Sequence, residues 1–303
     1  MLIREALAQG SIDLKYAEIE TPALDASILL AHVLKTTRTA LYAMGTKRIS
    51  EEACESFCGL VERRCAGECT AYLTGKKEFR ELEFTVNPSV LVPRPDTEIL
   101  VEAALDLLGS REPGAGMRDQ NCVAANDTKV LDLCTGSGAV AISLKHEMPE
   151  LDVYATDISA DALEVAKTNA ARLLSPNSII HFFLGDIYNA FPDSRPPTPD
   201  SLFSLIASNP PYIATDEIQT LSPEVRHEPR IALDGGASGL EIIKRIVEGA
   251  PDHLRSGGSL LLEADPRQMA DIVILLEKRG FFDIQLYNDL SGSQRVIGGR
   301  FEK

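Results

Sequence analysis

The second half of the chain alternates short apolar segments with longer amphipathic ones. Apolar runs at 129–134, 152–157 and 202–209 are bounded by turn residues and are typical of strands. The segments at 159–174 and 240–254 have the periodicity of helices that bury one face. Strands and helices that alternate at these lengths predict a doubly wound α/β fold with a largely parallel sheet.

The C-terminal end departs from this alternation. Two predicted strands, at 281–288 and 295–301, follow one another without a helix between them. Strands joined in this way pair antiparallel, because a parallel crossover needs a longer connection. We therefore expect an antiparallel edge on the sheet.

The N-terminal part is predicted to be helical. Leu24, Ile28, Ala31 and Leu34 recur at helical spacing, and Ser50 stands where it can cap a second helix. It carries no catalytic motif, so we expect a separate small helical domain.

Three parts are expected along the chain: a helical domain at 1–75, a hairpin with a proline-rich strap at 76–98, and the α/β domain at 99–303. Within the last part, the stretches 109–128 and 192–201 are rich in polar, glycine or proline residues without periodicity. They are predicted to be surface connections.

The charge of the chain disfavours nucleic acid as a partner. The formal net charge is −15, whereas proteins that grip nucleic acid neutralise phosphates with Lys and Arg. The N-terminus does not have the composition of a signal peptide, and no apolar run is long enough to cross a bilayer. We expect a cytoplasmic protein with a protein or small-molecule substrate and no membrane association.

Four of the six cysteines are close in sequence, between Cys54 and Cys69. On a straight helix Cys54 and Cys65 would be roughly 16 Å apart. One tetrahedral metal ion cannot join thiols at that separation. We expect no metal site and interpret these cysteines as small, buried apolar side chains.

A glycine-rich turn lies between the first predicted strand of the α/β domain and its helix. Gly136 and Gly138 would let the backbone approach a ligand closely. Asp157 ends the next strand, where its carboxylate could accept hydrogen bonds from a ribose diol. The pair predicts a cofactor that carries a nucleoside.

Two cofactors fit this turn. Gly136, Gly138 and Ala141 match the G-x-G-x-x-A pattern of dinucleotide sites, which favours NAD. Asp132, however, would repel a pyrophosphate and suits the cationic amino-acid end of S-adenosylmethionine. We favour S-adenosylmethionine, with NAD and a turn without ligand as the alternatives.

The segment Asn209-Pro210-Pro211-Tyr212 follows the strand at 202–209. An amide or aromatic amine nitrogen is a poor nucleophile, because its lone pair is delocalised, so an enzyme has to hold the NH2 group and aim it. The Asn209 side-chain carbonyl and the Pro210 backbone carbonyl can accept its hydrogens. The prolines stiffen the loop, and the Tyr212 ring can pack on the planar group. These residues predict methyl transfer to a planar NH2, with Asn209, Pro210 and Tyr212 as the catalytic residues.

Further motifs extend over most of the chain: AYLTGKKEF at 71–79, VLVPRPDTE at 90–98, LDLCTGSGA at 131–139, SNPPYI at 208–213, EVRHEPRIALDGGASGL at 224–240 and the terminal DLSGSQRVIGGR. On these motifs the chain resembles the HemK/PrmC protein-glutamine methyltransferases, which modify the glutamine of the Gly-Gly-Gln motif in peptide-chain release factors. Asn-Pro-Pro-Tyr alone is shared with adenine and cytosine amino-methyltransferases. Joined to the motifs at 93–98 and 228–229, it is specific.

The resemblance implies a Rossmann-like S-adenosylmethionine-dependent methyltransferase domain behind a helical domain that docks the release factor. The expected cofactor-binding residues are Asp132, Cys134, Thr135, Gly136, Ser137, Gly138, Asp157, Asp186, Ile187 and Asn209. The expected substrate-binding residues are Arg94, Thr97, Glu98, Asn209, Pro210, Pro211 and Tyr212.

The chain departs from the family pattern at two positions. Ala264-Asp265 stands where the family usually has a small residue followed by glycine, and Cys69 stands where proline is common. The alternatives from other classes are an amino-methyltransferase of nucleic acid, a glutamine methyltransferase of a ribosomal protein, an NAD-dependent enzyme and a non-catalytic binding module.

Overall fold

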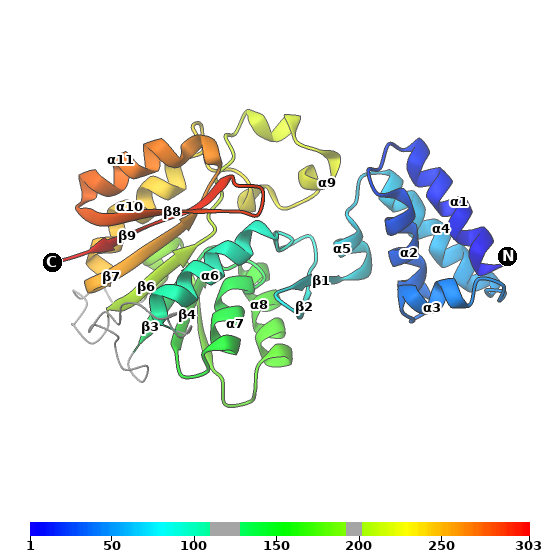
Figure 1. The fold of residues 1–303 in the computed structure, drawn as a ribbon, viewed down its shortest axis with the longest axis horizontal. Helices are drawn as coiled ribbons and strands as arrows, with labels where there is room; N and C mark the ends of the chain where they lie inside the picture. Colours follow the sequence, from blue (N-terminus) through cyan, green and yellow to red (C-terminus); the bar gives the residue numbers. More distant parts are fainter. Residues whose placement is uncertain (110–127, 192–201) are drawn as a thin grey trace. The chain divides into compact units, whose positions relative to one another are not determined.

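The structure, a computed structural model, describes residues 1–109, 128–191 and 202–303. Its contacts divide these residues into two units, drawn in Figure 1. The helical unit is Met1–Lys76 with Leu221–His227, and the larger unit is Lys77–Thr220 with Glu228–Lys303. The connections predicted at 109–128 and 192–201 lie outside the described residues, apart from Gly109 and Thr128.

The helical unit confirms the helices expected from the N-terminal sequence. Its helices are α1 (Ile3–Tyr16), α2 (Pro22–Val33), α3 (Arg38–Ala43), α4 (Glu51–Cys65), α5 (Thr70–Thr74) and the short α9 (Pro223–Arg226). Ser50 caps α4 as predicted, because its hydroxyl accepts a hydrogen bond from the Ala53 N–H. Leu14, Leu30 and Phe57 are fully or almost fully buried where α1, α2 and α4 pack together.

The residues whose spacing predicted α2 are buried to different degrees. Leu24 is exposed and Ala31 is buried, and the core also takes Ala26, Leu29 and Leu30 of this helix. Helix α2 contacts α1, α3, α4 and α5, so its buried surface is set by several neighbours rather than by one apolar stripe.

The interpretation of the cysteines as buried apolar side chains was also wrong for most of them. Cys58 is exposed, Cys54 and Cys65 are half-buried, and Cys69 alone among the described cysteines is buried. Helix α4 directs Phe57, Val61 and Arg64 into the core, which leaves its thiols along the edge of the buried face.

The larger unit begins with the predicted hairpin, β1 (Lys76–Phe79) and β2 (Leu82–Thr85). Its main strands are β3 (Lys129–Leu133), β4 (Asp152–Asp157), β5 (Ile180–Leu184), β6 (Phe203–Ser208), β7 (Leu254–Glu263), β8 (Phe281–Asn288) and β9 (Gln294–Phe301). Its main helices are α6 (Asp96–Leu108), α7 (Ala139–Glu147), α8 (Ala160–Leu173), α10 (Glu241–His253) and α11 (Met269–Arg279).

The main sheet has the order β5-β4-β3-β6-β7-β9-β8. The first five strands in this order are parallel, and β9 pairs antiparallel with both β7 and β8. This confirms the α/β fold and its antiparallel edge. The insertion of β9 distinguishes the sheet from the dinucleotide-binding order, in which six parallel strands run 3-2-1-4-5-6.

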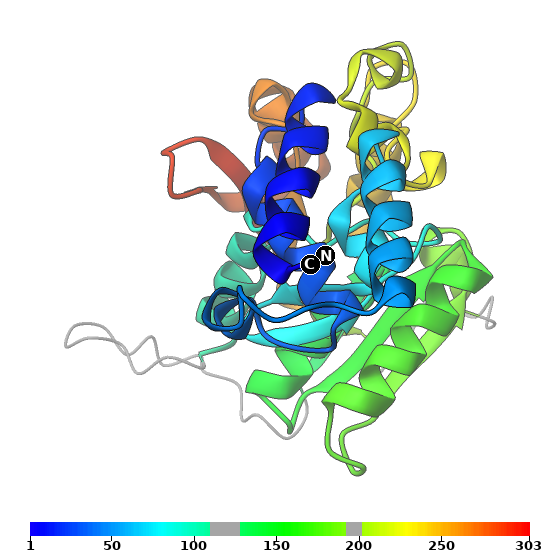
Figure 2. The same cartoon turned by 90° about the vertical axis from the view of Figure 1, so that its right-hand side faces the viewer.

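Helices cover both faces of this sheet. Apolar residues of α10 and α11, among them Ile243, Ile246 and Ile272, form one core with Leu131 and Leu260 of the strands. Helices α6, α7 and α8 neighbour one another on the other face. The side view in Figure 2 separates the green helix α8 from the orange helix α11. The strand order reverses between β3 and β6, where a ligand site is expected at the carboxyl ends of the strands.

Candidate functional site

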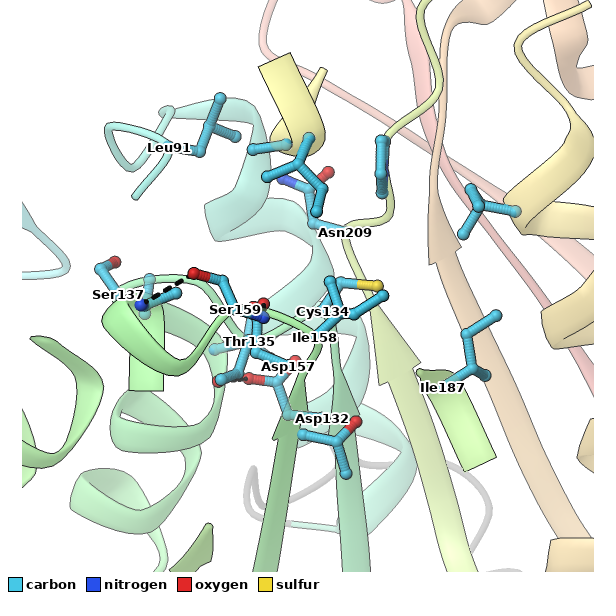
Figure 3. Close-up of a pocket in the computed structure, with 18 of the residues that line it drawn as sticks. Leu91, Asp132, Cys134, Thr135, Ser137, Asp157, Ile158, Ser159, Ile187 and Asn209 are labelled. Carbon is cyan, nitrogen blue, oxygen red and sulfur yellow. Dashed lines mark hydrogen bonds between the residues drawn. The ribbon is translucent and has the colours of Figure 1, made fainter. Parts of the chain in front are cut away.

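A cavity of about 550 Å³ opens at the carboxyl ends of β3, β4 and β6 (Figure 3). Its volume falls within the range of small-molecule sites, about 300–1,000 Å³. The predicted residues that line it are Thr97, Asp132, Cys134, Thr135, Ser137, Asp157, Asp186, Ile187, Asn209 and Pro211. The sequence thus predicted where the cavity lies.

Other predicted site residues are not part of the lining: Arg94, Glu98, Gly136, Gly138, Pro210 and Tyr212. Arg94 forms an ion pair with Glu228, whose carboxylate also accepts a hydrogen bond from the Val92 N–H at 3.3 Å. Glu98 accepts one from the Arg80 N–H at 3.5 Å. Arg94 and Glu98 therefore brace the strap and the hairpin in this structure.

The glycine turn after β3 has backbone angles that favour glycine. Gly136 and Gly138 have φ values of +56° and +84°. A Cβ on Gly138 would lie 2.7 Å from the Ile142 side chain, so glycine there allows close packing at the start of α7. A Cβ on Gly136 would meet no atom within 4 Å, which leaves open space beside the turn.

The Asp157 carboxylate is held in place by this turn. Its Oδ2 accepts a hydrogen bond from the Gly136 N–H and its Oδ1 one from the Ser159 N–H, both at 2.9 Å. Burial raises the pKa of Asp157, against the opposing effect of these hydrogen bonds. Each oxygen keeps a further lone pair, so the carboxylate can still accept from the two hydroxyls of a ribose.

Asp132 is buried at the end of β3 and contacts the turn from within. Its Oδ2 accepts from the Thr135 hydroxyl at 2.6 Å and from the Ala141 N–H at 3.1 Å. Burial raises its pKa to about 7. A pyrophosphate would need the free N–H groups at the start of α7, and Asp132 already occupies one of them. This favours S-adenosylmethionine over NAD.

Asn209 follows β6 and lines the cavity. Its side-chain NH2 donates to the Thr97 hydroxyl oxygen at 3.1 Å, which leaves its carbonyl oxygen as the group available to a substrate. The Ser208 hydroxyl donates to the Leu133 carbonyl at 2.7 Å and ties the end of β6 to β3. Figure 3 shows Asp132, Asp157 and Asn209, which come from the carboxyl ends of β3, β4 and β6.

Tyr212 is the last residue of the segment at 209–212, which we call the acceptor loop, and its side chain contacts the interior behind this loop. Its hydroxyl donates to Glu263 Oε1 at 3.4 Å, and its carbonyl accepts from the Gln268 side chain at 2.9 Å. Two glycines pass close to the loop: a Cβ on Gly235 would lie 2.7 Å from the Pro211 carbonyl oxygen, and one on Gly239 2.4 Å from that of Tyr212. Glycine at these two positions lets the segment at 224–240 pack closely against the acceptor loop.

Asp186 and Asp265 have partners of their own. Asp186 lines the cavity but forms an ion pair with Arg245 at 2.5 Å. Asp265, the departure from the family pattern, accepts from the Arg267 N–H at 2.8 Å and pairs with its guanidinium. Asp265 is not part of the cavity lining.

The sequence analysis missed several lining residues. They include Leu91, Ile158, Ser159, Ile231, Ala232 and Ile242. Ile158 and Ser159 directly follow Asp157, so their position after a strand-end acid could have identified them. Ile231, in a short 3-10 helix at Arg230–Ala232, falls within the motif at 224–240, which could have drawn attention to it, whereas Ile242 of α10 lies outside the motifs.

Residues 5–75 match the family model of the PrmC N-terminal domain, and residues 119–225 match that of the methyltransferase small domain. A release factor glutamine methyltransferase from Burkholderia pseudomallei is 41% identical over 282 residues, which cover 92% of each chain. The protein of that name from Escherichia coli is 36% identical over 299 residues, 99% of this chain and 97% of its own.

The structure of the hMettl16 catalytic domain in complex with the MAT2A 3′UTR hairpin 1 shares the fold. Its TM-score is 0.55 with 14% identity, and the match covers 82% of this chain and 81% of that chain. At this identity the likeness shows the fold alone. Over the described residues, none of the helices has the length and apolarity to span a membrane. The identity and coverage of the sequence relatives, with the two family models, show that the chain belongs to the release factor glutamine methyltransferase family, as its resemblance to HemK/PrmC indicated.

Proposed function

We propose that this chain transfers the methyl group of S-adenosylmethionine to the side-chain amide nitrogen of the glutamine in the Gly-Gly-Gln motif of peptide-chain release factors. The observation that carries the proposal is the orientation of Asn209. Its NH2 group is engaged by Thr97, so the cavity receives a hydrogen-bond acceptor, which is what a substrate NH2 requires.

The cavity has the groups that S-adenosylmethionine needs. The fixed carboxylate of Asp157 suits a ribose diol, and the open space beside Gly136 accommodates a ligand close to the backbone. The Thr156 hydroxyl in the lining is buried without a partner among the described residues, so it is available to a ligand. The apolar side chains of Ile158 and Ile187 suit the faces of an adenine.

The protein contributes mainly position to the reaction. When bound, S-adenosylmethionine supplies an electrophilic methyl group on a positively charged sulfur. The Asn209 and Pro210 carbonyls hold the two hydrogens of the glutamine NH2, which aims the nitrogen at that methyl. The nitrogen would take up the methyl group in exchange for one of its two hydrogens, which would leave as a proton to water, with S-adenosylhomocysteine as the other product.

Tyr212, Pro211 and the strap are assigned supporting roles. Pro210 and Pro211 restrict the loop, so its acceptors are in place before the substrate arrives. The Tyr212 hydroxyl, bonded to Glu263, keeps its ring beside this loop. Thr97 fixes Asn209, and Arg94 and Glu98 support the wall of the cavity.

We assign the docking of the release factor to the helical domain at 1–75, with 76–98 as the connection and 99–303 as the catalytic domain. The segment Leu221–His227, which belongs to the helical unit by its contacts, lies within the last range. The net charge of −15 supports a protein substrate and disfavours direct contact with nucleic acid. We assign the reaction to the cytoplasm.

The test is a methylation assay with labelled S-adenosylmethionine, the purified chain and a release factor, followed by mass spectrometry of the Gly-Gly-Gln peptide. We expect one methyl group on that glutamine and none on a release factor in which the glutamine is replaced by alanine. Ribosomal proteins, RNA and DNA are the competing acceptors. Preferential labelling of any of them would contradict the proposal.

A further inference from the structure

A buried carboxyl group lies behind the acceptor loop, where the proposed mechanism assigns it no role. Glu263 ends β7, the strand next to β6, and is 1% exposed. It is not part of the cavity lining, whereas Thr97 and Asn209 are. Any effect of Glu263 on a substrate therefore has to pass through another residue.

Two hydroxyl groups of the site reach Glu263. The Tyr212 hydroxyl donates to Oε1 at 3.4 Å, and the Thr97 side chain lies close enough to the same carboxyl to lower its pKa. The other oxygen, Oε2, is buried and has no partner of its own among the described residues. Glu263 thus has acceptor capacity that the Thr97 and Tyr212 hydroxyls can use.

The hydroxyl of Thr97 connects this carboxyl to Asn209. A threonine hydroxyl has a single hydrogen, and the Thr97 oxygen already accepts from the Asn209 NH2 at 3.1 Å. While Glu263 is ionised it can only accept, so the hydrogen of Thr97 is directed to it. In that arrangement the amide of Asn209 cannot turn over without placing its carbonyl against the oxygen of Thr97.

Resting on the glutamine methylation proposed above, we infer that Glu263 is a positioning residue for this reaction: through the Thr97 hydroxyl it keeps the Asn209 carbonyl oxygen directed at the substrate NH2. The relay consists of Glu263, Thr97 and Asn209, from three separate segments of the larger unit. It selects for a substrate that donates hydrogen bonds, because the reversed amide would present an NH2 to the incoming NH2.

The protonation of Glu263 would reverse the relay. Burial raises its pKa to about 7, with Asp96 of α6 raising it further and the Thr97 and Tyr212 hydroxyls and Arg295 of β9 lowering it. A protonated Glu263 can donate to Thr97, whose hydrogen then becomes free for the Asn209 carbonyl. Methyl transfer is therefore expected to fall as the pH drops below this pKa.

The first test compares Glu263→Gln, Thr97→Val and the double variant with the wild type on a release factor. Each single change should lower kcat about 10- to 100-fold, the range for hydrogen bonds to charged groups, with little change in the Kd of S-adenosylhomocysteine. The double variant should lose no more than the worse single one, since both break the same path. Losses that multiply would mean independent structural effects and would overturn the relay.

Two further variants separate the relay from a loss of folding. Thr97→Ser keeps the hydroxyl and should recover most of the activity that Thr97→Val loses. Thr128→Val makes the same exchange at another buried threonine, just before β3 and remote from the carboxyl ends of the strands, and should leave kcat unchanged. If Thr97→Ser were as impaired as Thr97→Val, the hydroxyl would not be what matters.

The pH profile distinguishes Glu263 from the other buried carboxyl of the site. The acid limb of kcat should be present in the wild type and absent in Glu263→Gln. Asp132 also has a pKa of about 7. An acid limb that survives in Glu263→Gln would belong to that group and would count against the relay.

A second readout needs no substrate. With ¹³C-labelled glutamate, the carboxyl signal missing from Glu263→Gln identifies Glu263, and its pKa can be titrated by NMR. Because Thr97 donates to the ionised carboxyl, Thr97→Val should raise this pKa further; an unchanged or lowered value would show that the proposed direction is wrong. If the wild type failed to methylate release factors, the proposed function would fall while this titration still reported on the relay. If it methylated them and Glu263→Gln did so equally well, only the relay would fall.

Discussion

Two groups of buried charges, one in each unit, have opposite surroundings. In the helical unit, the Arg64 side chain is 4% exposed and is paired with Asp25 at 2.7 Å and with Glu224. In the larger unit, Asp132 and Glu263 are each 1% exposed and form no salt bridge among the described residues. The charges around Arg64 neutralise one another, whereas Asp132 and Glu263 are buried without an ion pair.

The pKa values follow from this difference. Burial by itself would lower the pKa of Arg64, but the hydrogen bonds with Asp25 and Glu224 raise it, so the guanidinium stays charged. Burial raises the pKa of Asp132 and of Glu263 to about 7 because neither carboxyl forms an ion pair among the described residues that would offset the desolvation. Buried groups with strongly shifted pKa values cluster at functional sites, whereas paired ones are mainly structural. The comparison therefore assigns stability to the paired charges around Arg64 and chemistry to Asp132 and Glu263.

The largest expected effect tests the structural side. Arg64→Met would leave Asp25 buried without its cation, so the free energy of unfolding of the helical unit should fall by about 3–5 kcal/mol. Chemical denaturation monitored by circular dichroism measures it. Arg64→Met combined with Asp25→Leu removes both charges and should recover much of the loss. Equal stability of Arg64→Met and the wild type would break the comparison.

The next effect tests the chemical side. Asn209→Ala should lower kcat for methyl transfer by about 10²–10³-fold, because it removes an oxygen that is placed before the substrate arrives. The Kd of S-adenosylhomocysteine, measured by calorimetry, should change little. Near-normal turnover of this variant would contradict the role assigned to Asn209. Its stability should be close to that of the wild type, in contrast to Arg64→Met.

A smaller effect is expected at the ribose end of the cavity. Asp157→Ala removes charge-assisted hydrogen bonds to the cofactor and should weaken S-adenosylmethionine binding about 10- to 100-fold. The variant also loses the acceptor that holds the Gly136 and Ser159 N–H groups, so Asp157→Asn serves as the milder control. Unchanged affinity in both variants would rule out the ribose contact.

The last effect is a slope with pH, and it is the smallest one for each single pH unit. The folded protein holds the proton on Asp132 up to about pH 7, whereas the unfolded chain releases it near pH 4. The contribution of this group to stability is therefore complete below pH 4 and is lost as the pH rises to about 7, by at most about 1.4 kcal/mol per pH unit. Denaturation of wild type and Asp132→Asn across this range should show a steeper slope in the wild type, because the raised pKa of Glu263 contributes to both curves. Parallel curves would mean that Asp132 is ionised when folded.

Local patterns in the sequence predicted much of the fold. The alternation of apolar runs and the hairpin within 76–98 follow from periodicity and turn residues, which act over a few neighbours. The same patterns placed Asp132, Asp157 and Asn209 at the cavity, because each directly ends or follows a strand. The carboxyl ends of parallel strands meet at one edge of a sheet whatever the rest of the chain does.

Other features depended on contacts between distant segments. Which residues of α2 are buried depends on the several helices that it packs against, and the exposure of Cys58 depends on which side of α4 the core occupies. Arg94 and Glu98, expected at the cavity, have partners in Glu228 and Arg80.

The sequence by itself determined the fold class, the family and the strand ends that surround the cavity, since these depend on periodicity and on motifs of adjacent residues. Tertiary structure alone brought Thr97, Asn209 and Glu263 together, and it alone buried a carboxyl group there without an ion pair among the described residues. Burial and the direction of a hydrogen bond are properties of the surroundings of a residue, and those surroundings come from segments that are far apart in the chain.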